Sequence, residues 1–317
     1  MLITNLLFFT ISCAVLIVSG SFLIKSLSKI ASFLKISEFV AAFILMAFAT
    51  SVPELFVGIS AALIKNPALI LGTVIGSNIA VLTLIIGIAI IIGRGINIDS
   101  PNIKKDAMFM FFIALLPVVL MLINQSLSRI DGAILVSVFL FHLYRMYKKT
   151  KIFSKEMKGN IKRKEIVIAV FLFIASLVLL FYSAEFVVKY ATLLSVDLAL
   201  PSIIIGLFLV AIGTSLPELV FQSKAVLEGH SDMAMGDVIG AVVVNSTLVL
   251  GVSALIYPIT AHFLLFLVSA VFMIVIAFLF ATIMGITNRL SLNVGISFLL
   301  FYIFFVMVEF YIKTLGG

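Results

Sequence analysis

The chain has 317 residues, of which 63% are hydrophobic and 11% are charged, and its net charge is +7 at pH 7. A mean hydropathy of +1.35 excludes a soluble globular protein, in which about half of the residues are apolar. The composition therefore predicts a membrane protein that crosses the bilayer several times. The single cysteine, Cys13, excludes an internal disulfide bond.

Apolar runs long enough to cross a bilayer recur along the whole chain. The first has no basic residue ahead of it and no small-residue cleavage pattern, so we expect a retained helix rather than a signal peptide. Counting the runs predicts an all-α membrane protein with ten transmembrane helices. The expected spans are 2–24, 37–62, 67–93, 106–123, 129–147, 166–188, 199–227, 234–258, 262–286 and 291–312.

The sizeable polar segment, residues 148–165, reads KKTKIFSKEMKGNIKRKE and carries eight Lys or Arg. Because cytoplasmic loops retain basic residues, we expect a cytoplasmic linker between one five-helix unit, 1–147, and a second, 166–317. Both termini then face the outside of the cell membrane. The basic residues are not interleaved with aromatic ones, so no nucleic-acid partner is expected. The basic residues expected on the outer side are Lys65, Arg129, Lys189 and Lys313.

The second and seventh spans contain the same motif. The sequence AFATSVPEL at 47–55 returns as AIGTSLPEL at 211–219, and the offset of 164 residues holds without a gap as far as Gly87 and Gly251. Such a constant offset indicates a duplication. Because each unit has an odd number of spans, the two units enter the membrane from opposite sides. We therefore expect inverted repeats related by a pseudo-two-fold axis in the membrane plane.

Each copy of the motif places a proline and a carboxylate inside an apolar span. Proline removes a backbone hydrogen bond, so helices 2 and 7 should be broken at Pro53 and Pro217, with carbonyl oxygens freed beside the motif hydroxyls. A charge at the bilayer centre costs roughly 3 kcal/mol, and the carboxylates of Glu54 and Glu218 repel each other unless a cation or protons neutralise them. Carboxylate, hydroxyl and carbonyl oxygens are the ligands of hard cations. The motif therefore predicts a buried cation site.

Glycine-rich helices follow each motif, from Gly72 and from Gly236. Glycines spaced four apart allow close helix contact, and a packing role accounts for them as well as a functional one does. Close contact would bring secondary candidate ligands near the broken helices. These are Ser77, Asn78, Asp237 and Asn245.

Other charges within the spans fit ion pairs between residues four apart that snorkel to the interface. No transition-metal spacing involves the three histidines. The chain has no phosphate-binding loop, nucleophile elbow or dinucleotide fingerprint, so ATP-driven pumping and enzymatic catalysis lack support. The expected ion pairs are Glu185 with Lys189, Lys224 with Glu228, and Glu309 with Lys313.

The paired motifs, the glycine-rich helices and the basic linker resemble the cation/calcium antiporter superfamily, in particular the sodium/calcium exchangers of prokaryotes. The resemblance covers essentially the whole chain. It implies ten helices in two inverted halves, no cofactor, and calcium that leaves in exchange for sodium or protons. By motif position it implies Glu54 and Glu218 as carboxylates shared by calcium and sodium. Further implied ligands are oxygens of Thr50, Ser51, Thr214 and Ser215, the carbonyls of Ala47 and Ala211, and the Ser77 hydroxyl.

The chain departs from the family pattern at four positions. It has Val81 where sodium-coupled relatives often have asparagine, Ala241 and Asn245 in place of a serine and an aspartate, and Ala49 in place of a glycine. Two central carboxylates remain, which one calcium, two sodium ions or two protons would neutralise. We expect sodium to be the coupling ion because the hydroxyl and carbonyl ligands persist in both halves. Proton coupling is the alternative.

The predicted activity is calcium antiport by alternating access, carried out by a monomer in the lipid bilayer. Helices 1 and 6 lack the glycine-rich motifs, so we expect them to be the moving pair. A passive cation channel with the same acidic site is a second hypothesis. A non-transporting membrane scaffold would leave the duplicated carboxylates unexplained.

Overall fold

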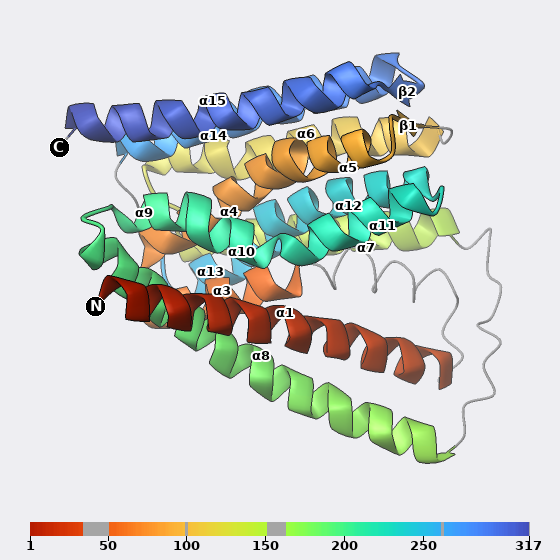
Figure 1. The fold of residues 1–317 in the computed structure, drawn as a ribbon, viewed down its shortest axis with the longest axis horizontal. Helices are drawn as coiled ribbons and strands as arrows, with labels where there is room; N and C mark the ends of the chain where they lie inside the picture. Colours follow the sequence, from red (N-terminus) through yellow and green to blue (C-terminus); the bar gives the residue numbers. More distant parts are fainter. Residues whose placement is uncertain (34–50, 99–100, 151–162, 261–262, 317) are drawn as a thin grey trace.

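The structure is a computed structural model that describes residues 1–33, 51–98, 101–150, 163–260 and 263–316. Figure 1 shows a bundle of long helices lying side by side. Among the described residues, seven helices are long and apolar enough to cross a membrane, or eight if one bent pair counts as a single span. The prediction of a helical, multi-pass membrane protein is therefore confirmed.

The first half of the chain contributes six α-helices and one π-helix to the described structure. Asn66 caps one of them, since its side chain accepts a hydrogen bond from the Leu69 amide at 3.3 Å and Pro67 stands at the first helical position. The elements are α1 (Leu2–Phe33), α3 (Val52–Leu63), α4 (Pro67–Ala80), η2 (Val81–Ile85), α5 (Ile86–Ile92), α6 (Pro101–Asn124) and α7 (Arg129–Thr150).

The second half begins with α8, which runs nine residues further than the sequence predicted, to Asp197. The predicted seventh span is confirmed as a broken helix, since α10 and α11 meet at an angle of 44°. The elements are α8 (Arg163–Asp197), α9 (Ser202–Ile205), η3 (Gly206–Val210), α10 (Ala211–Thr214), α11 (Leu216–Leu227), α12 (Ser231–Val244), η4 (Asn245–Val249), α13 (Leu250–Ile256), α14 (Phe263–Ile286) and α15 (Leu292–Gly316).

Element boundaries in the two halves repeat at the offset seen in the sequence. The bounds of α3, α4, η2 and α5 recur 164 residues later as those of α11, α12, η4 and α13. Both copies even share the π-helical turn, a distortion that often marks a functional site. The duplication is therefore visible in the backbone as well as in the residues.

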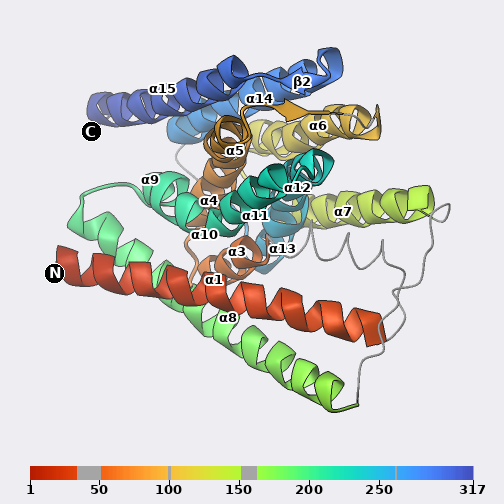
Figure 2. The ribbon, with the colours of Figure 1, turned by 45° about the vertical axis from the view of Figure 1, so that its right-hand side comes forward.

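Equivalent elements of the two halves pack against each other. Helix α1 lies along α8 and α6 lies along α14, and Figures 1 and 2 show α1 and α8 running in opposite directions at one edge of the bundle. Strand β1 (Ile96–Asn97) pairs antiparallel with β2 (Arg289–Leu290), and Leu127 pairs with Ile259. Every one of these pairings joins one half of the chain to the other.

The glycines after the first motif allow α4 to pack closely against η3 and α9. A Cβ at Gly72 would overlap the backbone of Ile203, and one at Gly76 would overlap the backbone of Leu207. Gly206 has a similar contact, because a Cβ there would lie 2.7 Å from the Leu69 carbonyl oxygen. The packing role of these two glycines of α4 is therefore confirmed.

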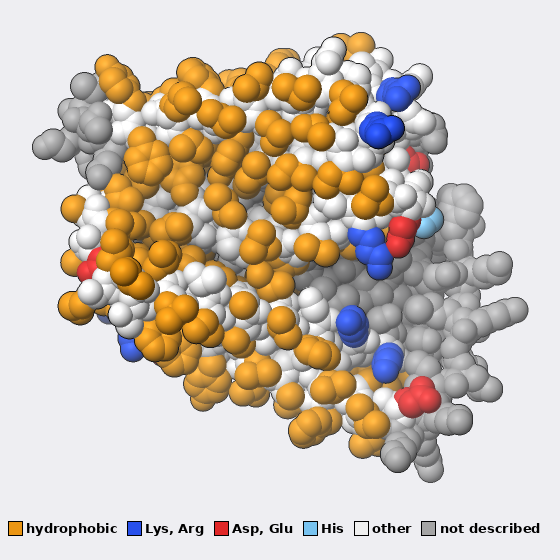
Figure 3. Space-filling model, in the orientation of Figure 1, with side chains coloured by type: hydrophobic (Ala, Val, Ile, Leu, Met, Phe, Trp, Pro, Cys, Tyr) orange, Lys and Arg blue, Asp and Glu red, His pale blue; other side chains and the backbone are white. Residues whose placement is uncertain are grey.

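Apolar side chains cover most of the described part of the face of the bundle seen in Figure 3. Phe112 is 60% exposed and Phe171 is 70% exposed, as expected of side chains that face lipid tails. Both chain termini lie at one end of the bundle, while α7 ends and α8 begins at the opposite end. The Lys and Arg side chains visible in Figure 3 gather toward that opposite end.

Candidate functional site

Two helices begin at the duplicated motif, and their first turns have the same geometry. Ser51 precedes α3 with φ −87° and ψ 6°, and Ser215 precedes α11 with φ −88° and ψ 7°. Pro53 and Pro217 occupy the first turn of the two helices. Because proline has no amide hydrogen, it begins a helix readily and breaks the one that precedes it.

The break in the second half changes the backbone hydrogen bonds only locally. Pro217 cannot donate to the carbonyl of Gly213, four residues earlier, so that carbonyl loses its helical donor. The Ala211 carbonyl, in contrast, accepts from the Ser215 amide at 3.0 Å and from the Thr214 hydroxyl at 3.3 Å. The Ala211 carbonyl therefore keeps a helical hydrogen bond, and its role as a cation ligand stays a prediction.

Glu54 lies in the first turn of α3, fully buried, and accepts hydrogen bonds at one oxygen. Its Oε1 accepts from Ser215 at 3.3 Å and from Ser77 at 3.5 Å. The two hydroxyl oxygens are 2.7 Å apart, and Ser77 also accepts from the Asn245 amide at 3.2 Å. The network therefore brings together α3, α4, η4 and the break before α11.

Glu218 lies in the first turn of α11 and is also fully buried. Neither of its carboxylate oxygens has a hydrogen-bond partner among the described residues. It is close enough to Glu54 and to Asp237 for their charges to act on it. The two repeated carboxylates are thus both in the bundle interior and within electrostatic range of each other.

Several buried oxygen atoms around these carboxylates have no hydrogen-bond partner among the described residues. A buried oxygen without a donor is costly, so each such atom needs an explanation. The set combines carboxylate, hydroxyl and amide oxygens, which are the ligands that hard cations prefer. It comprises Ser51 Oγ, Glu54 Oε2, Glu218 Oε1 and Oε2, and Asn245 Oδ1.

Polar residues of the two glycine-rich helices bond crosswise. The Asn245 amide donates to Ser77, and the Asn78 amide donates to Ser246 at 2.9 Å. At the equivalent positions of the other half, 164 residues away, all four residues are apolar and buried. They are Ala241, Val242, Val81 and Leu82. Each polar residue therefore finds its hydrogen-bond partner in the other half of the chain, at a position that is not the equivalent one.

Most of the predicted site residues are found at this centre. Ser51, Ser77, Thr214, Ser215 and Asn245 are buried there or in the adjoining turn. Ala47 and Thr50 lie outside the described residues. Sequence reasoning missed Ser246 and Gln222. Gln222 could have been found from its position one helical turn after Glu218, whereas the sequence holds no comparable signal for Ser246.

Charges elsewhere in the spans follow the predicted ion pairs only in part. Lys224 and Glu228 do pair at the surface, at 3.8 Å. Glu309 is fully buried and bonded to Ser269 at 2.6 Å, so the prediction that it snorkels to the interface is wrong. The side chain of its predicted partner, Lys313, lies outside the described set.

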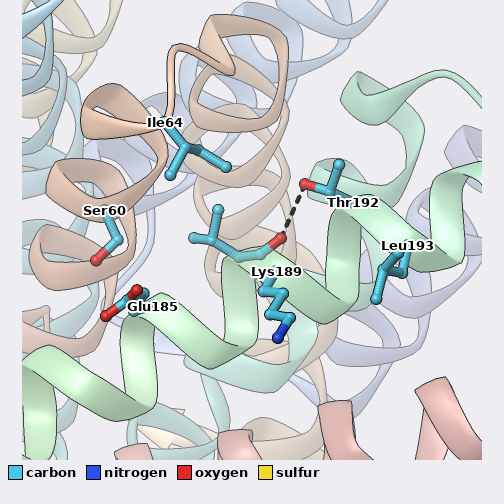
Figure 4. A pocket seen from close by; sticks show the side chains of 7 residues that line it. Ser60, Ile64, Glu185, Lys189, Thr192 and Leu193 are labelled. Carbon is cyan, nitrogen blue, oxygen red and sulfur yellow. Dashed lines mark hydrogen bonds between the residues drawn. The ribbon is translucent and has the colours of Figure 1, made fainter.

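Glu185 lines a cavity of about 340 Å³ between α3 and α8, together with Ser60 and Thr192. In Figure 4 the side chains of Glu185 and Ser60 point toward each other, and Lys189 points away from both. The Lys189 ammonium lies over the rings of Phe186 and Tyr190, 5.9 and 5.8 Å from their centroids. The predicted ion pair between Glu185 and Lys189 therefore does not form.

No group of three or more His, Cys, Asp or Glu able to hold a metal ion occurs in the described part of the chain. His142 stacks on Phe109, with ring centroids 5.5 Å apart. Cys13 is buried beside Gly213, as expected of a packing residue. The buried oxygens around Glu54 and Glu218 consequently carry the functional argument.

A family model described as "Sodium/calcium exchanger protein" matches residues 4–148 and 168–311. The chain is 28% identical to the sodium/calcium exchanger MaX1 of Methanosarcina acetivorans over 98% of this chain and 100% of that one. It is 32% identical to the inner membrane protein YrbG of Escherichia coli, over 67% of this chain and 68% of that one. A solved structure of the sodium-calcium exchanger NCX_Mj, soaked with Na⁺ and Sr²⁺, superposes with a TM-score of 0.68 at 26% identity, over 97% and 99% of the two chains.

Proposed function

Because this chain belongs to the sodium/calcium exchanger protein family, whose members are transporters rather than enzymes, we propose that it exchanges calcium for sodium across a cell membrane. The ions are its substrates, and no cofactor is needed. Calcium and sodium would bind in turn to the oxygens around Glu54 and Glu218. The choice of these two ions is supported by MaX1 and NCX_Mj, both of which are sodium/calcium exchangers by name.

The observation that carries the proposal is the pair of fully buried carboxylates with unpartnered oxygens. Neither Glu54 nor Glu218 forms an ion pair with a basic side chain in the described part of the chain. Two buried negative charges without a cation are strongly unfavourable. A cation held between them removes that cost, and competition for the same oxygens links the two ions in exchange.

Calcium prefers six to eight oxygen ligands, and sodium is satisfied by fewer. One calcium or two sodium ions would balance the charge of Glu54 and Glu218, and the neutral oxygens of Ser51, Ser77 and Asn245 suit either ion. Proton coupling is the alternative, since two protons would also neutralise the pair. The hydroxyl and amide oxygens favour sodium, because protons need only the carboxylates.

The two halves would form inverted repeats of five helices, 1–147 and 166–317, joined by a linker at 148–165. This arrangement would place the site on a pseudo-two-fold axis near the membrane centre. The repeated element boundaries support this arrangement. So does the antiparallel packing of α1 on α8, which are equivalent helices. We further propose that the linker faces the cytoplasm and that both termini face outward, because basic side chains gather at the end of the bundle away from the termini.

Transport would follow alternating access, with α1 and α8 moving against the remaining helices. The single cysteine offers a direct test, because a Cβ at position 213 would lie 3.8 Å from Cys13 Cβ, close to the mean separation in disulfides. Oxidation of a Gly213→Cys variant should lock α1 to α10 and stop exchange, and reduction should restore it. Exchange that continues in the fully oxidised variant would contradict motion of α1.

The function itself is tested with purified protein in liposomes, where calcium uptake is measured against imposed sodium, potassium or pH gradients. Sodium loaded inside the vesicles should drive uptake, and Glu54→Gln or Glu218→Gln should abolish it. Glu309→Gln is the matched control, since it removes another fully buried carboxylate of the bundle. Uptake that needs no counter-ion would indicate a channel, and uptake driven only by protons would establish the alternative coupling.

A further inference from the structure

A second buried polar pair lies beside the central site. Gln222 on α11 donates from Nε2 to Asp237 Oδ2 on α12 at 2.9 Å, and both side chains are fully buried. Figures 1 and 2 show α11 and α12 side by side. The carbonyl oxygen of Gln222 has no hydrogen-bond partner among the described residues.

The pair is directly continuous with the central site. Glu218 and Gln222 are four residues apart on α11 and therefore lie on the same helix face. Glu218 is close enough to Asp237 for the two charges to interact, and both of its oxygens lack a hydrogen-bond partner among the described residues. The buried oxygens of Glu218, Gln222 and Asp237 thus extend the group of candidate ligands beyond the central site.

The first half of the chain has no counterpart to this pair. The offset of 164 assigns Gln222 to Gly58 and Asp237 to Thr73. The space beside Gly58 is filled by the side chains of Ser253 and Val249. The Thr73 hydroxyl bonds to the carbonyl of its own helix, at Leu69. Among the described residues, the space that corresponds to Gln222 therefore holds the Ser253 hydroxyl from the other half, so the two halves differ in the side chains around their glutamates.

We propose that Glu218, Gln222 and Asp237 form a second cation station, which binds a monovalent cation of the sodium type while the central site operates. This inference rests on the proposed function and adds one coupling ion to it. The station offers a carboxylate on each side and one neutral carbonyl oxygen, too few oxygens for the six to eight that calcium takes.

The experiment measures sodium-driven calcium uptake in liposomes containing the parent protein, Asp237→Asn and Gln222→Met. Loss of the station should lower the steepness of the sodium dependence by about one ion and raise the sodium concentration for half-maximal uptake at least fivefold. Calcium KM should stay within twofold. Thr73→Val, the counterpart position in the first half, is the matched control and should behave as the parent does.

Sodium-induced thermal stabilisation without calcium provides a second measurement, with choline in place of sodium as the reference. The shift in Tm should be smaller in Asp237→Asn than in Thr73→Val, and recover in Asp237→Glu. Unchanged steepness and unchanged stabilisation in a folded Asp237→Asn protein would show that the pair is structural and overturn the proposal. Absence of sodium-driven uptake by the parent protein would instead refute the proposed function, so the two failures are distinct.

Discussion

Ser77→Ala removes the hydroxyl at the junction of the central network. The Ser77 and Ser215 hydroxyls have two hydrogens for three contacts, namely those with Glu54 Oε1 at 3.5 and 3.3 Å and the 2.7 Å contact between them, in which either hydroxyl can donate. The Asn245 amide in turn donates to Ser77. Ser77 therefore connects the Asn245 amide to both Ser215 and Glu54.

The substitution should affect stability and ion binding separately. It leaves a buried amide N–H of Asn245 without an acceptor in every state of the protein, which should lower the free energy of unfolding by about 1–3 kcal/mol. It also removes one oxygen ligand and the support that Ser77 gives to Ser215 and Glu54. A lost hydrogen bond to a charged group is worth about 1.5 kcal/mol, so calcium KM should rise roughly tenfold.

Calcium uptake in liposomes and thermal unfolding of the purified protein check the two effects. Ser253→Ala is the matched control, because that hydroxyl is also fully buried but has no hydrogen-bond partner among the described residues. It should not lower the free energy of unfolding, because it removes a buried hydroxyl that has no partner, and it should leave KM unaltered. A Ser77→Ala protein with the KM of the parent would refute the role of the hydroxyl as a ligand.

Three further predictions concern packing, ligand linkage and the buried acid outside the site. Gly76→Ala should lower the free energy of unfolding by about 1–3 kcal/mol, because the backbone of η3 occupies the space of the new methyl group; Gly285→Ala, next to open space among the described residues, should not. Calcium at a hundred times its Kd should stabilise the parent by about 2.7 kcal/mol, and thermal scans should show that Glu218→Gln loses this shift. Glu309→Gln should leave the free energy of unfolding unchanged. The Ser269 hydroxyl contacts both the Leu265 carbonyl and Glu309 but has one hydrogen, so it can donate to Leu265 and accept from the new amide.

The repeated motif was the most informative part of the sequence. Glu54 and Glu218 were identified from it because a carboxylate inside an apolar transmembrane span is energetically costly. The same costly residue also occurs twice, 164 residues apart. The break at Pro217 was predictable for a similar reason, since the missing amide hydrogen is a property of the residue itself. The fate of the Ala211 carbonyl was not, because it depends on whether the Ser215 amide remains in the helix.

Charged residues away from the motif show where local reasoning fails. A spacing of four correctly predicted the pair of Lys224 and Glu228, because both side chains stand on one exposed helix face. The same spacing failed for Glu185 and Lys189, since the neighbouring aromatic rings hold the ammonium. The prediction that Glu309 snorkels to the interface also failed, because that side chain is buried against Ser269 on α14.

By itself the sequence determined the membrane environment, the duplication and the two acidic residues at its centre, because each depends on residue type and spacing along one chain. Only the tertiary structure decided which oxygens meet. The bond of Asn245 to Ser77 and that of Gln222 to Asp237 join residues on different helices, and the first pair joins different halves. Such contacts depend on how closely α4, α11 and α12 approach and rotate, and those quantities are set by packing of whole helices rather than by any local pattern.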